Sequence, residues 1–492
     1  MQLKACYVFT LISGLATWLA EDAYALSTTK VRTERGVIHG FKDKSYPHVA
    51  QFLGIPYAEP PTGKRRWAPA VPKRHFGTLD ASAQGPACPQ SEPVVGDWAA
   101  EFLIKPNSTS EDCLYLNVWA PFSPSKEKLP VVIWIHGGGF GAGGGDIVYQ
   151  TPTPWVERSQ KHIVVSLNYR LGVFGFPNAA DLDPKEQNLG LLDQRLAVEW
   201  VRDNIANFGG DPERIVIWGQ SAGAVSVGYY QYAWTKDPIA RGYIQNSGGV
   251  FLNIGSPDPS HTNFTALAKA FGYTKGNEVD YLRRIPFKDI QRYVENGTGL
   301  GFTPVVDERT KFSDYAKRIL SPKIPKLPLI IGSNRDEGDF GANINHTAGT
   351  PPYQVKPDST FGCPAYYETS LRTKAGATTY RYEYSANFTN IMPKGLGAFH
   401  SAELPLIFGT HNAARAKSGQ FEYDVSHAMQ NYWLEFIQDP TGGPSKHGWD
   451  PTPAGQLNTI QKGVEFGFNN TIAVRKYDWA SWQKGCKGAT AV

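Results

Sequence analysis

Short apolar segments alternate with amphipathic segments through the middle of the chain. Continuous apolar runs occupy residues 130–135, 163–167 and 215–218, a pattern typical of strands buried on both faces of a sheet. Residues 193–208 carry apolar side chains at helical spacing and end at a glycine pair, which predicts a helix. This alternation predicts the α/β class, with a large, mostly parallel central sheet flanked by helices.

Further strands and helices are indicated on both sides of this region. Residues 263–296 are helical but less periodic, which indicates an insertion over the sheet, and residues 420–436 carry an apolar helical stripe. Strand patterns occur at residues 31–41, 50–57, 114–120, 243–245, 327–332 and 379–384. Because no linker-like segment or internal repeat interrupts the chain, we predict one domain over residues 26–492.

The first 25 residues have the features of a secretory signal peptide. Lys4 supplies a positive charge, residues 5–19 form a short apolar core, and residues 23–25 (A-Y-A) resemble a cleavage site. A membrane anchor is the alternative, but the apolar run is short, and no other stretch of about 18 apolar residues follows. We therefore expect a secreted, extracellular protein without stable membrane insertion.

The composition allows a sizeable core and gives no sign of a nucleic-acid partner. Of the 492 residues, 41% are hydrophobic. The net charge of +4 arises from interspersed basic and acidic residues, with no basic run. We therefore expect no binding to nucleic acid.

Secretion favours disulfides and glycans, and the chain has candidates for both. Cys6 leaves with the signal peptide, and the four remaining cysteines allow three pairings. Cys88 with Cys113 is the local choice, and Cys363 with Cys486 then follows only by elimination. The N-x-[ST] glycosylation sequons are at Asn107, Asn263, Asn296, Asn345, Asn387 and Asn469.

The candidate chemistry centres on Gly219-Gln220-Ser221-Ala222-Gly223, which reads G-x-S-x-G. An apolar run precedes these residues, and small residues that favour a helix follow them. Strand, tight turn and helix form the setting of a nucleophile elbow, in which the glycines let the helix return close to the strand. We expect Ser221 to be a nucleophile at the end of the strand; the alternative is an ordinary glycine-rich turn.

A serine nucleophile needs a histidine base, and the base needs a carboxylate to orient it. In this setting the acid and the histidine follow the serine along the chain. Glu337 follows the strand predicted at residues 327–332, and its competitors are Asp336 and Asp339. His400 lies in a glycine-rich loop after a strand, as expected of the base. The other histidine candidates are His346, His411, His427 and His447.

Residues 136–140, H-G-G-G-F, follow a predicted strand and are candidates for an oxyanion hole. Without side chains, Gly138 and Gly139 can bring their N–H groups close to a substrate, and Ala222 supplies another N–H after the nucleophile. The same stretch satisfies G-x-G-x-x-G, but residues 146–154 contain two prolines and resemble a loop rather than the helix of a dinucleotide site. We expect no cofactor and no metal.

Several segments together make the chain resemble the type B carboxylesterase/lipase family, the cholinesterase-like branch of the α/β-hydrolases. They are E-D-C-L-Y-L-N at 111–117, H-G-G-G-F at 136–140, D-Q-R-L-A at 193–197, N-F-G-G-D-P at 207–212, P-V-V-D at 304–307, D-E-G at 336–338, and the G-x-x-H-x-x-E-x-x-x-x-F-G spacing of 397–409. The resemblance extends from about residue 31 to residue 436, and it implies an α/β-hydrolase fold.

The resemblance also implies roles for particular residues. The implied catalytic residues are Ser221, Glu337 and His400, and the implied oxyanion donors are Gly138, Gly139 and Ala222. It implies a Cys88–Cys113 bridge, and Ser247 resembles a family serine that lies near the acid. For an apolar acyl pocket we predict the residues just past that serine, Val250, Phe251 and Leu252.

The chain departs from the family pattern in two ways that concern the substrate. Gln220 stands where the family usually has glutamate, so a negative charge beside the site is lost and a cationic choline substrate is disfavoured. The interval between Glu337 and His400 is short, which predicts trimmed or rebuilt pocket elements between residues 250 and 400.

These residues predict a secreted serine hydrolase that cleaves a small-molecule or lipid ester through an acyl-enzyme. A binding or adhesion protein on the same scaffold is the alternative from another class. Amide or lactone hydrolysis, or acyl transfer, would use the same site. The sequence leaves the acyl group and the oligomeric state open.

Overall fold

The computed structural model describes residues 28–90, 109–122, 127–255, 257–337, 360–391, 397–413, 416–453, 462–478 and 486. Eleven strands form the central sheet. They are β3 (Phe41–Asp43), β4 (Tyr46–Pro56), β6 (Tyr115–Pro121), β7 (Leu129–Ile135), β8 (Ile163–Leu167), β9 (Gly210–Gln220), β10 (Ala240–Asn246), β11 (Leu329–Asn334), β12 (Thr379–Tyr384), β13 (Lys462–Phe468) and β14 (Ile472–Asp478).

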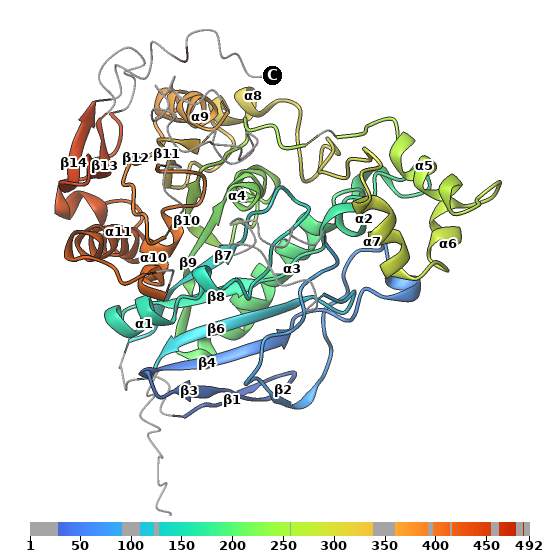
Figure 1. Ribbon diagram of the computed structural model, residues 1–492, viewed down its shortest axis with the longest axis horizontal. Helices are drawn as coiled ribbons and strands as arrows, with labels where there is room; N and C mark the ends of the chain where they lie inside the picture. Colours follow the sequence, from blue (N-terminus) through green and yellow to red (C-terminus); the bar gives the residue numbers. More distant parts are fainter. Residues whose placement is uncertain are drawn as a thin grey trace, which may run out of the picture.

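The sheet is parallel in its centre and antiparallel at both ends. Its strand order is β14-β13-β12-β11-β10-β9-β7-β8-β6-β4-β3. Every neighbouring pair from β13 to β8 is parallel, and the remaining pairs are antiparallel. Figure 1 shows β13 and β14 at one end of the sheet and β3 and β4 at the other. The predicted fold class is confirmed.

Helices cover both faces of the sheet, so the core has two layers. Along β7, Val131, Ile133 and Ile135 enter the layer with α3 and α4, whereas Val132 and Trp134 enter the layer with α10 and α11, because successive side chains of a strand point to opposite faces. The helices are α1 (Thr153–Ser159), α2 (Gly172–Gly175), α3 (Leu189–Asn204), α4 (Ala222–Ala233), α5 (Thr262–Ala270), α6 (Glu278–Leu282), α7 (Phe287–Glu295), α8 (Tyr315–Leu320), α9 (Gly362–Lys374), α10 (Leu404–Phe408) and α11 (Gln420–Gln438).

The single strand predicted at residues 31–41 is wrong. The structure divides this stretch into β1 (Lys30–Thr33), β2 (Gly36–His39) and the start of β3, because a turn at residues 34–35 reverses the chain. Gly36 permits this turn through a positive φ of 149°, which other residues rarely adopt. With β5 (Gly77–Asp80), β1 and β2 form a separate sheet of three strands.

The segment predicted as a helical insertion contains α5, α6 and α7. These helices lie together beyond the sheet in Figure 1 and share a hydrophobic cluster with residues of α2 and α3. The sequence patterns did not predict α9, α10, β13 or β14. In the part of the chain that the structure describes, no helix combines the length and apolar character needed to cross a bilayer.

Candidate active site

Ser221 occupies a strained turn between β9 and α4. Its φ and ψ are 54° and −125°, a conformation that costs a non-glycine residue about 1–3 kcal/mol. The glycines on either side are sterically required. A Cβ on Gly219 would lie 2.3 Å from the carbonyl carbon of Gly223, and a Cβ on Gly223 would lie 2.0 Å from the carbonyl oxygen of Ile135. The turn therefore has the geometry of a nucleophile elbow.

Glu337 and His400 form a buried pair beside this turn. Glu337 lies just past the end of β11, and its Oε2 is 2.5 Å from His400 Nδ1. Its other oxygen, Oε1, accepts the backbone N–H of Asn334 at 2.7 Å. The two side chains are only 0% and 3% exposed, so little water competes for this contact. A carboxylate at Nδ1 fixes the imidazole tautomer and orientation that a general base needs.

Two of the competing residues, Asp336 and His411, have other partners in the structure. Asp336 accepts the backbone N–H of Ala398 at 2.7 Å rather than facing His400, and burial raises its pKa. His411 lies 2.8 Å from Ser418 Oγ. His427 lies in α11, and His447 ends the short helical turn at Pro444–His447 that follows it. His346 and Asp339 are outside the described residues.

Ser221 and His400 line one cavity of about 300 Å³. Among the described residues around it, His400 is the only titratable side chain; the others are glycine, apolar or uncharged polar residues. The lining residues are Gly137, Gly138, Gly139, Ile147, Gln150, Gln220, Ser221, Leu252, Asn253, Ile254, Gly255, Thr360, Phe361, His400 and Ser401. A concave, mostly apolar site with a few converging polar groups is typical of a small-molecule site.

The loop after β7 brings glycine backbone to the wall of this cavity. Gly138 and Gly139, which both line it, have φ values of 107° and 63°. A Cβ on Gly138 would lie 2.2 Å from the carbonyl oxygen of Ala142, so only glycine fits there. Ala222 is the first residue of α4, where helix geometry leaves the backbone N–H without a partner in the helix. These backbone groups can serve as donors to an oxyanion.

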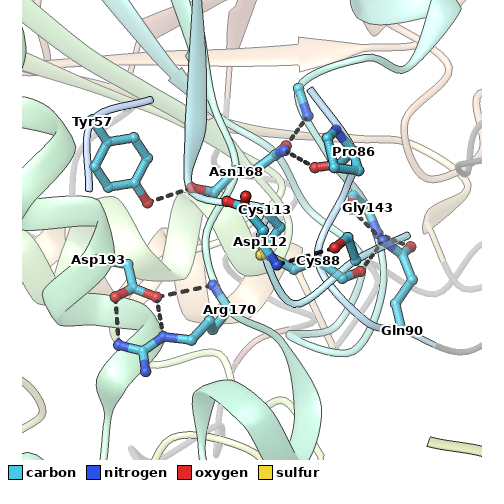
Figure 2. Close-up of a disulfide and its surroundings, with 12 residues drawn as sticks. Tyr57, Pro86, Cys88, Gln90, Asp112, Cys113, Gly143, Asn168, Arg170 and Asp193 are labelled. Atoms are coloured by element: carbon cyan, nitrogen blue, oxygen red, sulfur yellow. Dashed lines mark hydrogen bonds and ion pairs between the residues drawn. A yellow bond between two sulfur atoms is a disulfide. The ribbon is translucent and has the colours of Figure 1, made fainter. Parts of the chain in front are cut away.

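Hydrogen bonds of two polar side chains connect the C-terminal end of this loop, Gly143 to Gly145, to the segment around Cys88 (Figure 2). Gln90 donates to the Gly143 carbonyl oxygen and accepts the Gly143 N–H, both at 2.8 Å. Asn168 accepts the N–H of Gly145 at 2.7 Å and donates to the carbonyl oxygen of Pro86 at 3.0 Å. The sequence analysis missed Gln90, although its position two residues after a cysteine was a signal.

His136 supports the near end of the same loop. Its Nδ1 lies 2.8 Å from the carbonyl oxygen of Gly137, and its ring stacks on Tyr169 with centroids 4.5 Å apart. Burial lowers the pKa of His136 to about 4, so the imidazole is neutral at ordinary pH. Its Nδ1 therefore donates to the Gly137 carbonyl rather than carrying a charge.

A buried acidic network lies behind the histidine. Glu403 accepts the side-chain amides of Asn334 at 2.6 Å and Asn246 at 3.1 Å. Burial, together with the nearby Glu337, raises the pKa of Glu403 to about 7. Ser247 lies at the end of β10 and donates its N–H to the Gly332 carbonyl oxygen, while its buried Oγ has no hydrogen-bond partner among the described residues.

Of the three residues predicted for the acyl pocket, one lines the cavity and two pack against α9. Leu252 lines the cavity. Val250 donates its N–H to Glu368 of α9 at 3.0 Å, and the Phe251 ring packs on Tyr367 of the same helix, with centroids 4.7 Å apart. The cavity wall continues from Leu252 to Gly255 instead. Sequence reasoning also missed Phe361, whose ring centroid is 4.4 Å from that of His400.

The structure contains two disulfides and exposes several sequons. The disulfides join Cys88 to Cys113 and Cys363 to Cys486. The exposed sequon asparagines are Asn296, Asn387 and Asn469; Asn263 is half-buried, and Asn107 and Asn345 lie outside the described residues. Within the described ranges, no group of three or more histidine, cysteine or acidic residues could hold a metal ion.

Comparison with known proteins identifies a family and named relatives. The profile of the carboxylesterase family matches residues 27–356 and 352–476. The chain is 42% identical to chlorogenic acid esterase of Aspergillus niger, over 93% of each chain. It is 40% identical to secreted lipase 5 of Gibberella zeae, over 89% of this chain and 90% of that protein. It is 32% identical to para-nitrobenzyl esterase of Bacillus subtilis, over 84% and 90%.

Proposed function

Because this chain belongs to the carboxylesterase family and is a carboxylic-ester hydrolase, we propose that Ser221 is its nucleophile, His400 its base and Glu337 the acid that orients the base. The observation that carries the proposal is the 2.5 Å contact between Glu337 and His400 at a cavity that Ser221 also lines. The proposed oxyanion donors are the backbone N–H groups of Gly138, Gly139 and Ala222.

The reaction proceeds through an acyl-enzyme. Ser221 Oγ attacks the ester carbonyl carbon while His400 Nε2 takes the hydroxyl proton, and the oxyanion receives the backbone N–H donors. The carbonyl then re-forms, the carbon–alkoxide bond breaks, and His400 gives its proton to the departing alcohol. Water repeats the sequence on the acyl-enzyme and releases the carboxylic acid. Each oxyanion donor contributes about 10²–10³ in rate.

We propose that soluble aromatic esters, including chlorogenic acid, are substrates. The supporting relative is chlorogenic acid esterase, and the Phe361 ring beside His400 offers an aromatic face to a planar acyl group. A cavity of about 300 Å³ suits a small ester. Chlorogenic acid carries a free carboxylate, so the site would accept an anionic ester. A panel that includes short and long 4-nitrophenyl esters and a triacylglycerol, scored by kcat/KM, tests this preference against a lipase.

We further propose that residues 1–25 are a signal peptide and that residues 26–492 form one secreted, N-glycosylated domain. The relative named secreted lipase 5, the two disulfides and the exposed sequons support this proposal. N-terminal sequencing of the protein from culture medium, and its mass before and after deglycosylation, would test it. An N-terminus upstream of residue 26 in the mature protein would contradict it.

The catalytic assignment is tested by labelling with a fluorophosphonate probe. The wild-type chain should label rapidly and Ser221→Ala should not, because only an activated serine reacts at a useful rate. Equal labelling of the two proteins would reject Ser221 as nucleophile. Turnover of amides or lactones would instead reassign the bond that is cleaved, and transfer to an added alcohol faster than hydrolysis would reassign the acyl acceptor. A protein that binds a protein partner but turns over no ester would favour an adhesion role.

A further inference from the structure

The side chain of Gln220 lies against the nitrogen of His400 that must accept the serine proton. Gln220 Nε2 is 3.0 Å from His400 Nε2 and 2.9 Å from Ser401 Oγ. Its Oε1 lies against the loop after β7 that carries the proposed oxyanion donors Gly138 and Gly139 (the oxyanion loop), because a Cβ on Gly137 would be only 2.7 Å from it. Gln220 is 2% exposed and immediately precedes Ser221. The carboxamide of this elbow residue therefore contacts both the oxyanion loop and the loop that carries His400.

The other hydrogen bonds of Gln220 and His400 indicate which atom donates and which accepts in this contact. Glu337 Oε2 is an acceptor, so His400 Nδ1 must carry the hydrogen of that 2.5 Å bond. In a neutral imidazole, Nε2 is then an acceptor without hydrogen. The carboxamide nitrogen can only donate, and Ser401 Oγ can accept its second hydrogen. With the carboxamide in this orientation, the contact fits a neutral imidazole, because an imidazolium N–H would face another N–H.

We propose that Gln220 is a positioning residue that favours the neutral imidazole of His400 in the free enzyme and adds no negative charge to the cavity, so that the site accepts esters bearing a carboxylate. The proposal rests on the function proposed above, because it names the substrate class of the same site. A glutamate at this position would do the opposite: its carboxylate would stabilise the imidazolium and repel an anionic ester.

The acidic groups near His400 lie on its Nδ1 side, so residue 220 decides whether a charge lies on the Nε2 side. Glu337 faces Nδ1 of His400, and behind it lie Glu403 and Asp336, both with pKa values raised by burial. On the Nε2 side, the described residues around the carboxamide present hydroxyl, glycine and ring atoms of the cavity lining, and none of these groups is ionised. A carboxylate at residue 220 would therefore introduce a charge directly at the nitrogen that takes up the proton.

Gln220 also allows proton transfer to proceed. As the Ser221 Oγ–H bond breaks and the His400 Nε2–H bond forms, the hydrogen bond from the carboxamide to Nε2 is lost. Ser401 Oγ still accepts from the same nitrogen, so the side chain retains one partner throughout. The contact favours the neutral base before reaction without blocking its protonation.

The test compares Gln220→Glu with Gln150→Glu. Gln150 lines the same cavity, but its Oε1 accepts the indole N–H of Trp134 at 3.0 Å, a bond that glutamate can keep. Both variants add one carboxylate to the cavity, and only one adds it at His400. We would measure kcat/KM from pH 4 to 9 with 4-nitrophenyl butyrate. We would also compare mono-4-nitrophenyl succinate with its methyl ester.

Gln220→Glu should move the acidic limb of the profile upward by about 1–3 pH units, the effect of an opposite charge within hydrogen-bond distance. It should also lower kcat/KM for the anionic ester relative to its methyl ester by at least about tenfold, and Gln150→Glu should do clearly less on both measures. Equal shifts for the two variants, or no shift for Gln220→Glu, would overturn the proposal.

A second measurement separates this proposal from the catalytic assignment. In a Ser221→Ala background, NMR titration of the His400 imidazole reports protonation without turnover. Adding Gln220→Glu to this background should shift the titration of the imidazole to higher pH, although no ester is hydrolysed. Absence of probe labelling and of ester turnover in the wild type would reject only the proposed function. If Gln220→Glu folds poorly, Gln220→Met removes the donor without adding charge. The Met variant should keep the wild-type ratio of kcat/KM for the anionic ester to that for its methyl ester, and a lower ratio would contradict the proposal.

Discussion

Replacement of Gln90 by alanine would test how the loop with the proposed oxyanion donors is held in place. The side chain is 6% exposed and makes two 2.8 Å bonds to the backbone of Gly143, one as donor and one as acceptor. It also donates to the Cys88 carbonyl oxygen at 3.1 Å. Because Cys88 is bonded to Cys113, the loop is tied to a covalently fixed segment (Figure 2).

The structure gives the magnitude of the effect. Gln90→Ala leaves both the N–H and the carbonyl of Gly143 without their partner, and each buried unpaired group costs about 1–3 kcal/mol. The native loop geometry is thus destabilised by about 2–6 kcal/mol. The loop can relax by moving, and we expect this movement to displace Gly138 and Gly139. Since one oxyanion donor is worth about 10²–10³ in rate, we expect kcat to fall by at least about tenfold with little change in KM.

Steady-state kinetics with 4-nitrophenyl butyrate, together with the Tm, would check this prediction. The control is Gln420→Ala, because Gln420 is an exposed glutamine of α11 that bonds only to Asp424 among the described side chains. The control should retain wild-type kinetics. If Gln90→Ala keeps kcat within about twofold of the wild type and unfolds at the same temperature, the loop does not depend on this side chain and the reasoning is refuted.

Three further predictions concern packing, pH and cross-linking. Gly223→Ala should abolish activity and lower soluble yield, because its Cβ would lie 2.0 Å from the Ile135 carbonyl oxygen; normal kinetics would contradict the steric argument. Burial raises the pKa of Glu383 to about 7, so the folded state holds this proton more tightly than the unfolded state, and stability falls as pH rises from about 4.5 through 7. Glu383→Gln should therefore gain Tm relative to the wild type between pH 5 and pH 8, and a pH-independent difference would reject this. Loss of the Cys363–Cys486 bridge in a double serine variant should cost roughly 2–5 kcal/mol of stability in denaturant unfolding, and an unchanged midpoint would show that the bridge adds none.

Hydrophobic patterning predicted the elements whose burial is uniform. The strands expected at residues 163–167 and 379–384 coincide with β8 and β12, and the class of the fold is confirmed. These central strands are buried on both faces, so their composition depends on burial alone. Hydrophobic patterning predicted the strands at the edge of the molecule less well. The stretch 31–41 is three strands rather than one, since a turn at two polar residues interrupts a pattern that remains half apolar.

Elements that depend on distant partners escaped prediction. In α9, both polar and apolar residues are buried, including Glu368, Thr369 and Arg372, so no apolar stripe marks the helix. Arg372 is satisfied by the Gln231 side chain at 2.8 Å and by backbone carbonyls. A buried polar residue is stable only because its partners are present, and those partners lie far away in the chain. Periodicity alone could not find this helix.

The sequence by itself determined the local parts of the candidate site. The G-x-S-x-G turn, the glycine loop after β7 and the loop around His400 each depend on backbone conformations that a few consecutive residues specify. Tertiary structure decided which groups meet. Glu337 and His400 are 63 residues apart, and the parallel alignment of β9, β10 and β11 brings the ends of these strands to one edge. There Asp336 is engaged by Ala398, which leaves Glu337 to the histidine, and Gln220 reaches Nε2; such contacts depend on distances that no local pattern encodes.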